Sequence, residues 1–206
     1  MLERKNEITS FFKRFHLATP IHAHPACLLM KSRDADAELE VDVVDSDGEG
    51  GTVTKKRQQW WQSFVDKQGI PKVKAVEQGP KIVLFLHILM GSITLGDKVV
   101  VFSQCLKTLD FIEEVLSLEN WVDHVPSLAS AFPGRHFGGW TRGLEYLRLD
   151  GATDSETRGQ FIKKFQAKDE APEDRVQLFL ISCKAGGIGE FNTFLCARPT
   201  FVLDLS

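Results

Sequence analysis

Cysteine is scarce in this 206-residue sequence, and no two cysteines lie close together. The four cysteines are Cys27, Cys105, Cys183 and Cys196. Such spacing excludes a zinc ribbon and a disulfide scaffold, and it is typical of proteins from a reducing compartment.

Long apolar runs are also missing. The longest run, from Ile82 to Met90, is interrupted by His87 and is too short to span a bilayer. Residues 1–7 are rich in charge and lack the apolar core of a signal peptide. We therefore expect neither a membrane partner nor secretion, and the 43% hydrophobic residues are ordinary for a globular protein.

Basic residues are absent from one stretch, residues 34–49, which holds eight acids. Without these eight, the 28 acids of the chain fall to 20 against 25 bases, a balance of +5. The net charge of −3 for the whole chain therefore hides a basic remainder. This remainder permits nucleic-acid binding without requiring it.

Composition divides the chain into three segments. Residues 1–30 form a short junction segment, in which Pro20 and Pro25 predict an extended stretch. Residues 31–59 are acidic, then glycine-rich, then basic, which is typical of a disordered linker or of an acidic partner-binding segment. Residues 60–206 carry the regular patterns of a folded domain.

His22 and His24 lie two residues apart in the junction segment and would share one side of an extended chain. No third metal ligand is evident beside them. We expect no metal site there.

Helical and strand patterns alternate from Pro80 onward. Pro80 suits a first helical turn and Gly96 suits the stop, and the apolar residues between them predict a helix buried on more than one side. Strands are predicted at residues 98–104, 145–149, 176–182 and 200–205, with helices at 106–116 and after Thr153. This alternation predicts an α/β fold with a mostly parallel sheet.

Two local features qualify this pattern. Thr153 followed by Glu156 predicts a capping box at the start of a helix that turns Phe161, Ile162 and Phe165 inward. Residues 119–143 have mixed composition and predict a long surface insertion, which is more often functional or disordered than structural.

Ligands of such sheets bind at the carboxyl ends of the strands, and three of the predicted ends are polar. The polar residues of the first two ends are Ser103, Gln104, Arg148, Asp150, Gly151, Thr153 and Arg158. Ser103 and Gln104 suit hydrogen bonds to a phosphate backbone, or are ordinary polar strand ends. Each arginine either meets phosphate or is a solvated charge, and Asp150 either orients an arginine or caps the following turn.

The third strand end is a glycine-rich loop with Lys184, Gly186, Gly187 and Gly189. Glycine lets backbone N–H groups approach phosphate oxygens, and Lys184 adds positive charge. The loop fits neither the P-loop pattern nor the dinucleotide fingerprint, and a tight turn without a ligand is an equal alternative.

The three ends in this order resemble the second-lobe motifs of Snf2-type helicase-like ATPases. The matching residues are Lys98–Gln104, Arg148–Thr153 with Arg158 and Phe165, and Ser182–Gly189. Gly79–Leu84 is similar to the start of the second RecA-like lobe, and Ile21–Leu28 to the junction of the two lobes. The acidic segment and Trp60–Val65 most resemble the ATRX-like branch of chromatin remodellers.

The resemblance implies a RecA-like second lobe of a nuclear motor that translocates on double-stranded DNA in chromatin. It places Ser103, Gln104, Arg148, Arg158 and Lys184 at the DNA. It places Asp150, Gly151, Thr153, Gly186, Gly187, Gly189 and Asn192 at the nucleotide cleft and the surface between the lobes. ATP and Mg²⁺ would be held only in a complete two-lobe motor, so no catalytic residue is assigned here.

Two departures from the family pattern favour a rival hypothesis. Glu190 and the displaced Asn192 indicate a short insertion in the loop, and Glu190 brings negative charge to it. A first lobe and the arginine motif of the family are absent from these residues, so we expect a sheet that is incomplete at the C-terminus and no ATP hydrolysis by the chain alone. The rival is an inactive DNA- or protein-interaction module that keeps the fold.

Overall fold

The structure of the protein is a computed structural model that describes residues 20–30, 75–167, 176–185 and 200–205. Its principal elements are α3 (Pro80–Leu95), β1 (Lys98–Ser103), α4 (Leu106–Leu116), α5 (Pro126–Ala131), β2 (Tyr146–Leu149), α6 (Ser155–Gln166), β3 (Leu178–Ser182) and β4 (Thr200–Asp204). Short 3-10 helices lie at η1 (Pro25–Leu29), η3 (Val76–Gln78) and η4 (Trp121–His124). The predicted alternation of helices and strands is confirmed for these residues.

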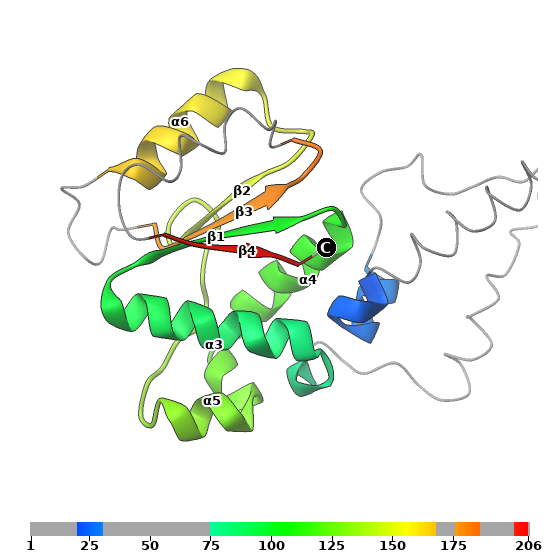
Figure 1. Cartoon of the computed structure of the whole chain (residues 1–206), viewed down its shortest axis with the longest axis vertical. Coiled ribbons are helices and arrows are strands. Elements are labelled where there is room, and N and C mark those ends of the chain that lie inside the picture. The colour runs from blue at the N-terminus through cyan, green and yellow to red at the C-terminus, as the bar shows by residue number, and fades with distance from the viewer. Residues whose placement is uncertain (1–19, 31–74, 168–175, 186–199, 206) are drawn as a thin grey trace, which may run out of the picture. The chain divides into compact units, whose positions relative to one another are not determined.

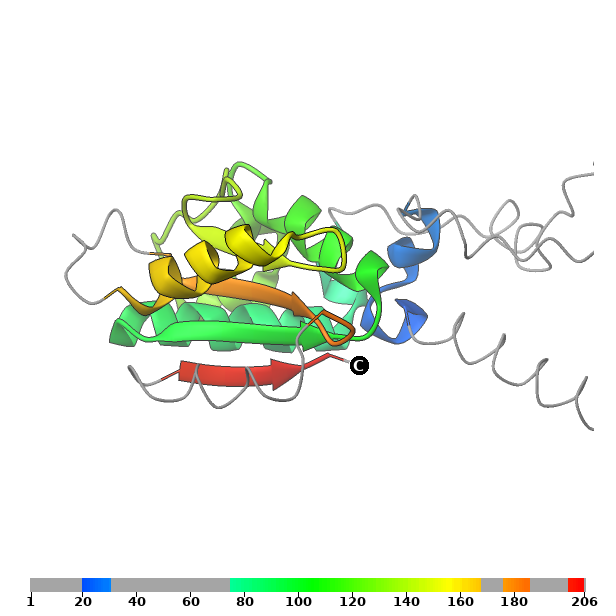
Figure 2. The ribbon, with the colours of Figure 1, turned by 90° about the horizontal axis from the view of Figure 1, so that it is seen from above.

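The four strands form one sheet in the order β2-β3-β1-β4, and every pair is parallel. Strand β1 lies inside the sheet and is buried along its whole length, as its apolar run predicted. Figures 1 and 2 show α6 on one face of the sheet and α3 and α4 on the other. The α/β fold class with a parallel sheet is therefore confirmed.

The core alternates with the pleat of the strands. Val100, Leu147 and Phe179 belong to the cluster beneath α6, where Phe165 lies 5.3 Å from Phe179 between ring centroids. Phe161 and Ile162 also pack on this cluster, as predicted. Lys98 is buried at the same face, and its ammonium donates to the carbonyl of Phe165 near the end of α6.

Helix α3 begins at Pro80 and ends before Gly96, as predicted. Its buried side chains include Ile82, Phe85 and Leu89, which lie on one side of the helix. Leu84 and Leu95 are 61% and 74% exposed. The buried side chains of α3 thus span a broad part of the helix, and Leu84 and Leu95 lie outside it.

Residues 119–143 fold against the domain. Trp121 is fully buried and its ring lies 6.2 Å from that of Trp140, edge to face. The chain passes so closely at Gly138 that an added Cβ would lie 1.8 Å from the carbonyl oxygen of Glu119. This segment therefore contributes packing, an alternative that its mixed composition did not favour.

The extended stretch predicted around His22 and His24 is not found. Residues 20–23 are helical and Pro25–Leu29 is a 3-10 helix. His24 is buried against Phe111, with ring centroids 4.3 Å apart, and its Nε2 lies 2.9 Å from the carbonyl oxygen of Ala75. Its Nδ1 accepts a hydrogen bond from the N–H of Ala26, so both ring nitrogens are engaged within the fold.

The described ranges contain no group of three or more histidine, cysteine or acidic residues that could hold a metal ion. Within the same ranges, no helix has both the length and the apolar character needed to cross a membrane. The predicted linker at 31–59 and the Trp60–Val65 segment lie outside the described residues.

Gly96 offers a test of the end of α3. It has φ 77°, in the left-handed region, so Gly96→Ala should lower the free energy of unfolding by about 1–2 kcal/mol. Gly91→Ala is the matched control in the same helix, where an added Cβ meets nothing within 4 Å. It should raise stability by about 0.5–1 kcal/mol. Urea denaturation measures both, and equal signs for the two variants would contradict this account.

His24 predicts a pH dependence. Burial lowers the pKa of His24, partly offset by its hydrogen bond to Ala75. Its contribution to stability is therefore complete above the unfolded-state pKa, near 6.5, and is lost as pH falls from there toward the folded-state pKa. In denaturation at pH 5 to 7.5, His24→Gln should show a shallower loss of stability on acidification than the parent. His22→Gln, at an exposed position, should keep the parental slope.

Candidate functional site

The carboxyl ends of three adjacent strands meet at one edge of the sheet. Ser103 of β1 pairs with Ser182 of β3, and Leu149 of β2 pairs with Ile181 of β3. The residues that follow these strands therefore start side by side. The predicted gathering of three polar strand ends is present in the backbone.

The predicted residues at this edge differ in exposure. Gln104, Gly151 and Lys184 are exposed, and Thr153 and Arg158 are half-buried. Ser103 is buried, and its hydroxyl accepts a hydrogen bond from the N–H of Cys105 at 3.1 Å. Ser103 thus serves the local turn rather than the surface, which corrects its predicted side-chain contact with DNA.

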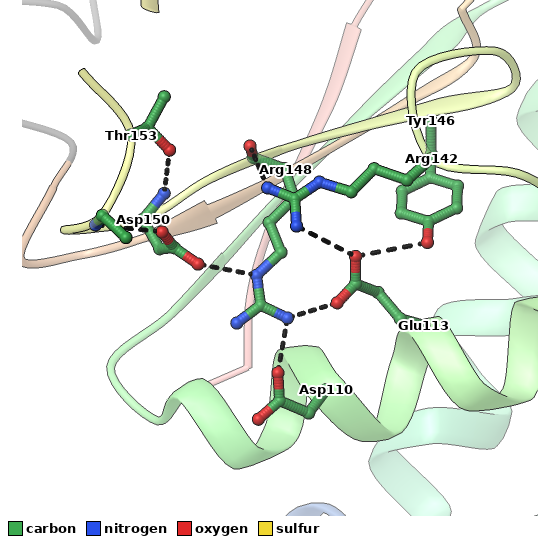
Figure 3. Close-up of polar contacts among 8 residues, drawn as sticks. Asp110, Glu113, Arg142, Tyr146, Arg148, Asp150 and Thr153 are labelled. Atoms are coloured by element: carbon green, nitrogen blue, oxygen red, sulfur yellow. Dashed lines mark hydrogen bonds and ion pairs between the residues drawn. The ribbon is translucent and has the colours of Figure 1, made fainter. Parts of the chain in front are cut away.

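The predicted contact between Arg148 and DNA also needs correction. Its side chain is 0% exposed and lies within a cluster of three carboxylates, drawn in Figure 3. The Nε atom donates to Asp150 Oδ2 at 3.0 Å, and Nη1 donates to Asp110 Oδ1 at 2.6 Å and to Glu113 Oε2. A phosphate outside the protein cannot reach this guanidinium, so Arg148 is not a DNA contact in this structure.

Helix α4 supplies two of these acids. Asp110 and Glu113 are three residues apart and therefore lie on the same side of the helix, facing β2. Burial by itself would lower the pKa of Arg148, but Glu113 and Asp110 raise it, so the net direction is upward. The buried charge of Arg148 is thus compensated, as a buried ion requires.

Glu113 also joins Tyr146 to the cluster. Tyr146 is the single tyrosine of the chain, and its hydroxyl donates to Glu113 Oε1 at 3.2 Å. Burial raises the pKa of Tyr146, and the neighbouring Glu113 charge raises it further. Tyr146 therefore remains a neutral donor to the carboxylate.

The outer edge of β2 is covered by the segment that precedes it. Arg142 Nη2 donates to the carbonyl of Arg148 at 3.2 Å, and the N–H of Gly143 donates to the carbonyl of Tyr146 at 2.8 Å. These bonds occupy backbone acceptors that an edge strand otherwise leaves open.

The turn after β2 is built around Asp150. Its Oδ1 accepts from the N–H of Ala152 at 3.1 Å, while its own N–H donates to Thr153 Oγ1 at 3.1 Å. Both alternatives considered for Asp150 are therefore present, because one oxygen orients Arg148 and the other holds the turn. Asp150 is largely buried, at 7% exposure, so its carboxylate faces the interior rather than the predicted cleft.

The predicted capping box is wrong. Asp154 is the N-cap of α6, and its side chain accepts from the N–H groups of Glu156 and Thr157. Thr153 instead serves the turn through Asp150. Because Asp154 already occupies the first amides of α6, these groups are not offered to a phosphate.

Arg158 ties α6 to the loop after β3. Its Nη1 donates to the carbonyl of Ala185 at 2.6 Å, next to Lys184. The described residues end at Ala185 in this loop, so the predicted site residues Gly186, Gly187, Gly189 and Asn192 lie outside them.

Four members of the cluster were missed from the sequence: Asp110, Glu113, Arg142 and Tyr146. The available signal was weak. An amphipathic helix with acids at 110 and 113 follows a buried strand, and one strand further on carries an arginine among apolar residues. Nothing in that spacing says that the arginine faces the helix.

Comparison with known proteins matches most of the chain. The transcriptional regulator ATRX homolog of Drosophila melanogaster is 36% identical over 165 residues, which covers 77% of this chain and 12% of the relative. Helicase ARIP4 of Mus musculus is 39% identical over 131 residues, which covers 64% of this chain and 8% of the relative.

The chain is a homologue of the Snf2-family helicases ATRX and ARIP4. This relationship confirms the predicted resemblance to Snf2-type ATPases. The chain spans about a tenth of the length of these Snf2 relatives, 12% of one and 8% of the other. No family model matches the chain.

Among solved structures, the C-terminal part of the Fun30 ATPase domain aligns with 70% of this chain, and the alignment covers 46% of that chain. The TM-score is 0.39 and the sequence identity is 19%.

Replacement of Arg148 should strongly lower the stability of the domain. Arg148→Met leaves three carboxylates facing an uncharged side chain, and we expect the free energy of unfolding to fall by about 3–5 kcal/mol. Arg142→Met is the control, because Arg142 is 40% exposed and lies 4.0 Å from Glu113. It should cost about 1 kcal/mol or less. Similar losses for both variants in urea denaturation would argue against the buried cluster.

Proposed function

We propose that this chain contributes the second motor lobe of an ATP-dependent, double-stranded DNA translocase that acts on chromatin in the nucleus. The proposal rests on the relationship to ATRX and ARIP4 together with the polar edge of the sheet. ATP and Mg²⁺ belong to the complete two-lobe motor, in which a first RecA-like lobe is the partner of this one.

The observation that carries the proposal is the common edge of β1, β2 and β3. It brings exposed Gln104 and Lys184 to one side of the sheet, beside the turn at Gly151. A lysine and an amide side chain suit hydrogen bonds to phosphate oxygens, which position a duplex without reading its sequence.

The charge at this edge is mixed, so binding by this lobe alone should be weak. Lys184 and Arg158 are countered by Asp154 and Glu156 at the start of α6, both of which are exposed. Attraction to phosphate therefore depends on few cations, and the affinity should fall with salt along a slope of log K against log salt that is set by these few contacts.

The rival function is an inactive interaction module with the same fold. The two hypotheses differ in what a first lobe adds. A motor lobe should yield DNA-stimulated ATP hydrolysis when it is joined to the first lobe and the arginine motif of a relative, whereas an inactive module should yield none.

Lys184 provides the direct test of the DNA edge. Lys184→Gln should weaken binding to a random-sequence duplex several-fold, and the slope of log K against log salt should become shallower by about 1. Lys163→Gln is the matched control, because Lys163 is exposed near the opposite end of α6 and therefore near the amino edge of the sheet. Fluorescence anisotropy with a labelled duplex at several salt concentrations measures both variants.

Binding that does not change between low and physiological salt would contradict the proposal. So would equal losses for Lys184→Gln and Lys163→Gln, since they would show that binding does not use the carboxyl edge.

A further inference from the structure

We infer that Arg148 is a positioning residue, which sets the conformation of the turn at residues 150–153 through Asp150 and couples that turn to α4. The inference rests on the proposed function only in assigning this turn to the DNA-facing edge of the sheet. The geometry of the coupling stands independently of any ligand.

The first step is that the two oxygens of the Asp150 carboxylate bind different partners. Oδ2 accepts from Arg148 Nε at 3.0 Å, and Oδ1 accepts from the N–H of Ala152 at 3.1 Å. With both oxygens held, the carboxylate cannot rotate without breaking one of the two bonds. Arg148 therefore fixes the plane of the group that organises the turn (Figure 3).

The second step is the closure of the turn itself. The N–H of Thr153 donates to the carbonyl of Asp150 at 3.0 Å, and Thr153 Oγ1 accepts from the N–H of Asp150 at 3.1 Å. Together with the bond from Ala152, three hydrogen bonds close on Asp150. Exposed Gly151 lies at the tip of this small ring, so the position of Asp150 determines what the edge presents.

The third step is the connection to α4. The same guanidinium that holds Asp150 through Nε is held by Asp110 and Glu113 through Nη1. A planar guanidinium keeps these directions fixed relative to each other, which the compact ammonium of lysine does not. Movement of α4 relative to β2 is thereby transmitted to the turn.

The unpaired Nη2 atom of Arg148 raises the alternative that this guanidinium binds an anion. Nη2 is buried and has no hydrogen-bond partner among the described residues. The surroundings disfavour an anion, however, because three carboxylates face this one guanidinium. We therefore assign Arg148 to positioning and not to phosphate binding.

Two variants test the coupling. Arg148→Lys keeps the charge but loses the fixed fork, and Asp150→Asn places either an amide donor against Nε or an amide donor against the N–H of Ala152. Both should accelerate hydrogen exchange of the Ala152 and Thr153 amides by about tenfold, because a charge-assisted hydrogen bond is lost. Both should also weaken DNA binding several-fold.

Arg142→Lys is the matched control, since Arg142 contacts the same Glu113 and the same strand but not Asp150. It should leave exchange at Ala152 and Thr153 unchanged. The amides of Phe179 and Leu180 in β3 report on the sheet, and their protection should be parental in all three variants.

Parental exchange at Ala152 and Thr153 in Arg148→Lys and Asp150→Asn would overturn the inference. Loss of protection in β3 to the same extent as in the turn would also overturn it, because Arg148 would then be only a structural residue. Failure of the parent chain to bind DNA would remove the proposed function, whereas the exchange measurement would still decide whether Arg148 positions the turn.

Discussion

Parallel pairing within the sheet is the constraint on which the other features depend. Because β1 pairs in the same direction with β3 and β4, and β3 with β2, the chain must return along the sheet before it starts the next strand, and the described helices α4 and α6 lie on the faces of the sheet. The helices therefore cover both faces, which explains the fully buried β1. The same pairing brings the polar segments after β1, β2 and β3 to one edge of the sheet. The polar surface at this edge therefore needs all three strands.

Burial of Arg148 follows from this arrangement. In a strand covered on both faces, every side chain meets a helix or the protein interior, and at position 148 the neighbour is α4. A guanidinium in that place needs carboxylate partners, since an unpaired buried charge is strongly unfavourable. Asp110, Glu113 and Asp150 meet this need. The polar end of β2 therefore contributes to the interior of the domain as well as to the carboxyl edge of the sheet.

Much of the fold was predictable from local patterns. Pro80 and Gly96 marked the two ends of α3, and the valine run of β1 predicted a strand covered on both faces. The errors arose where one residue had competing partners. Thr153 had the spacing of a capping box, yet Asp154 caps α6 because the Thr153 hydroxyl is engaged with the N–H of Asp150.

The amino-acid sequence alone determined the alternation of helices and strands and the polar character of three strand ends, because these depend on periodicity and on residues close in the chain. Its motifs also carried the resemblance to Snf2-type ATPases. Only the tertiary structure decided which polar residues face outward. Gln104 and Lys184 are exposed while Ser103 and Arg148 are buried, although all four belong to similar strand ends. Ser103 and Arg148 lie within β1 and β2, which other segments cover, whereas Gln104 and Lys184 lie just beyond the ends of β1 and β3. Which residues are covered is set by contacts between distant segments.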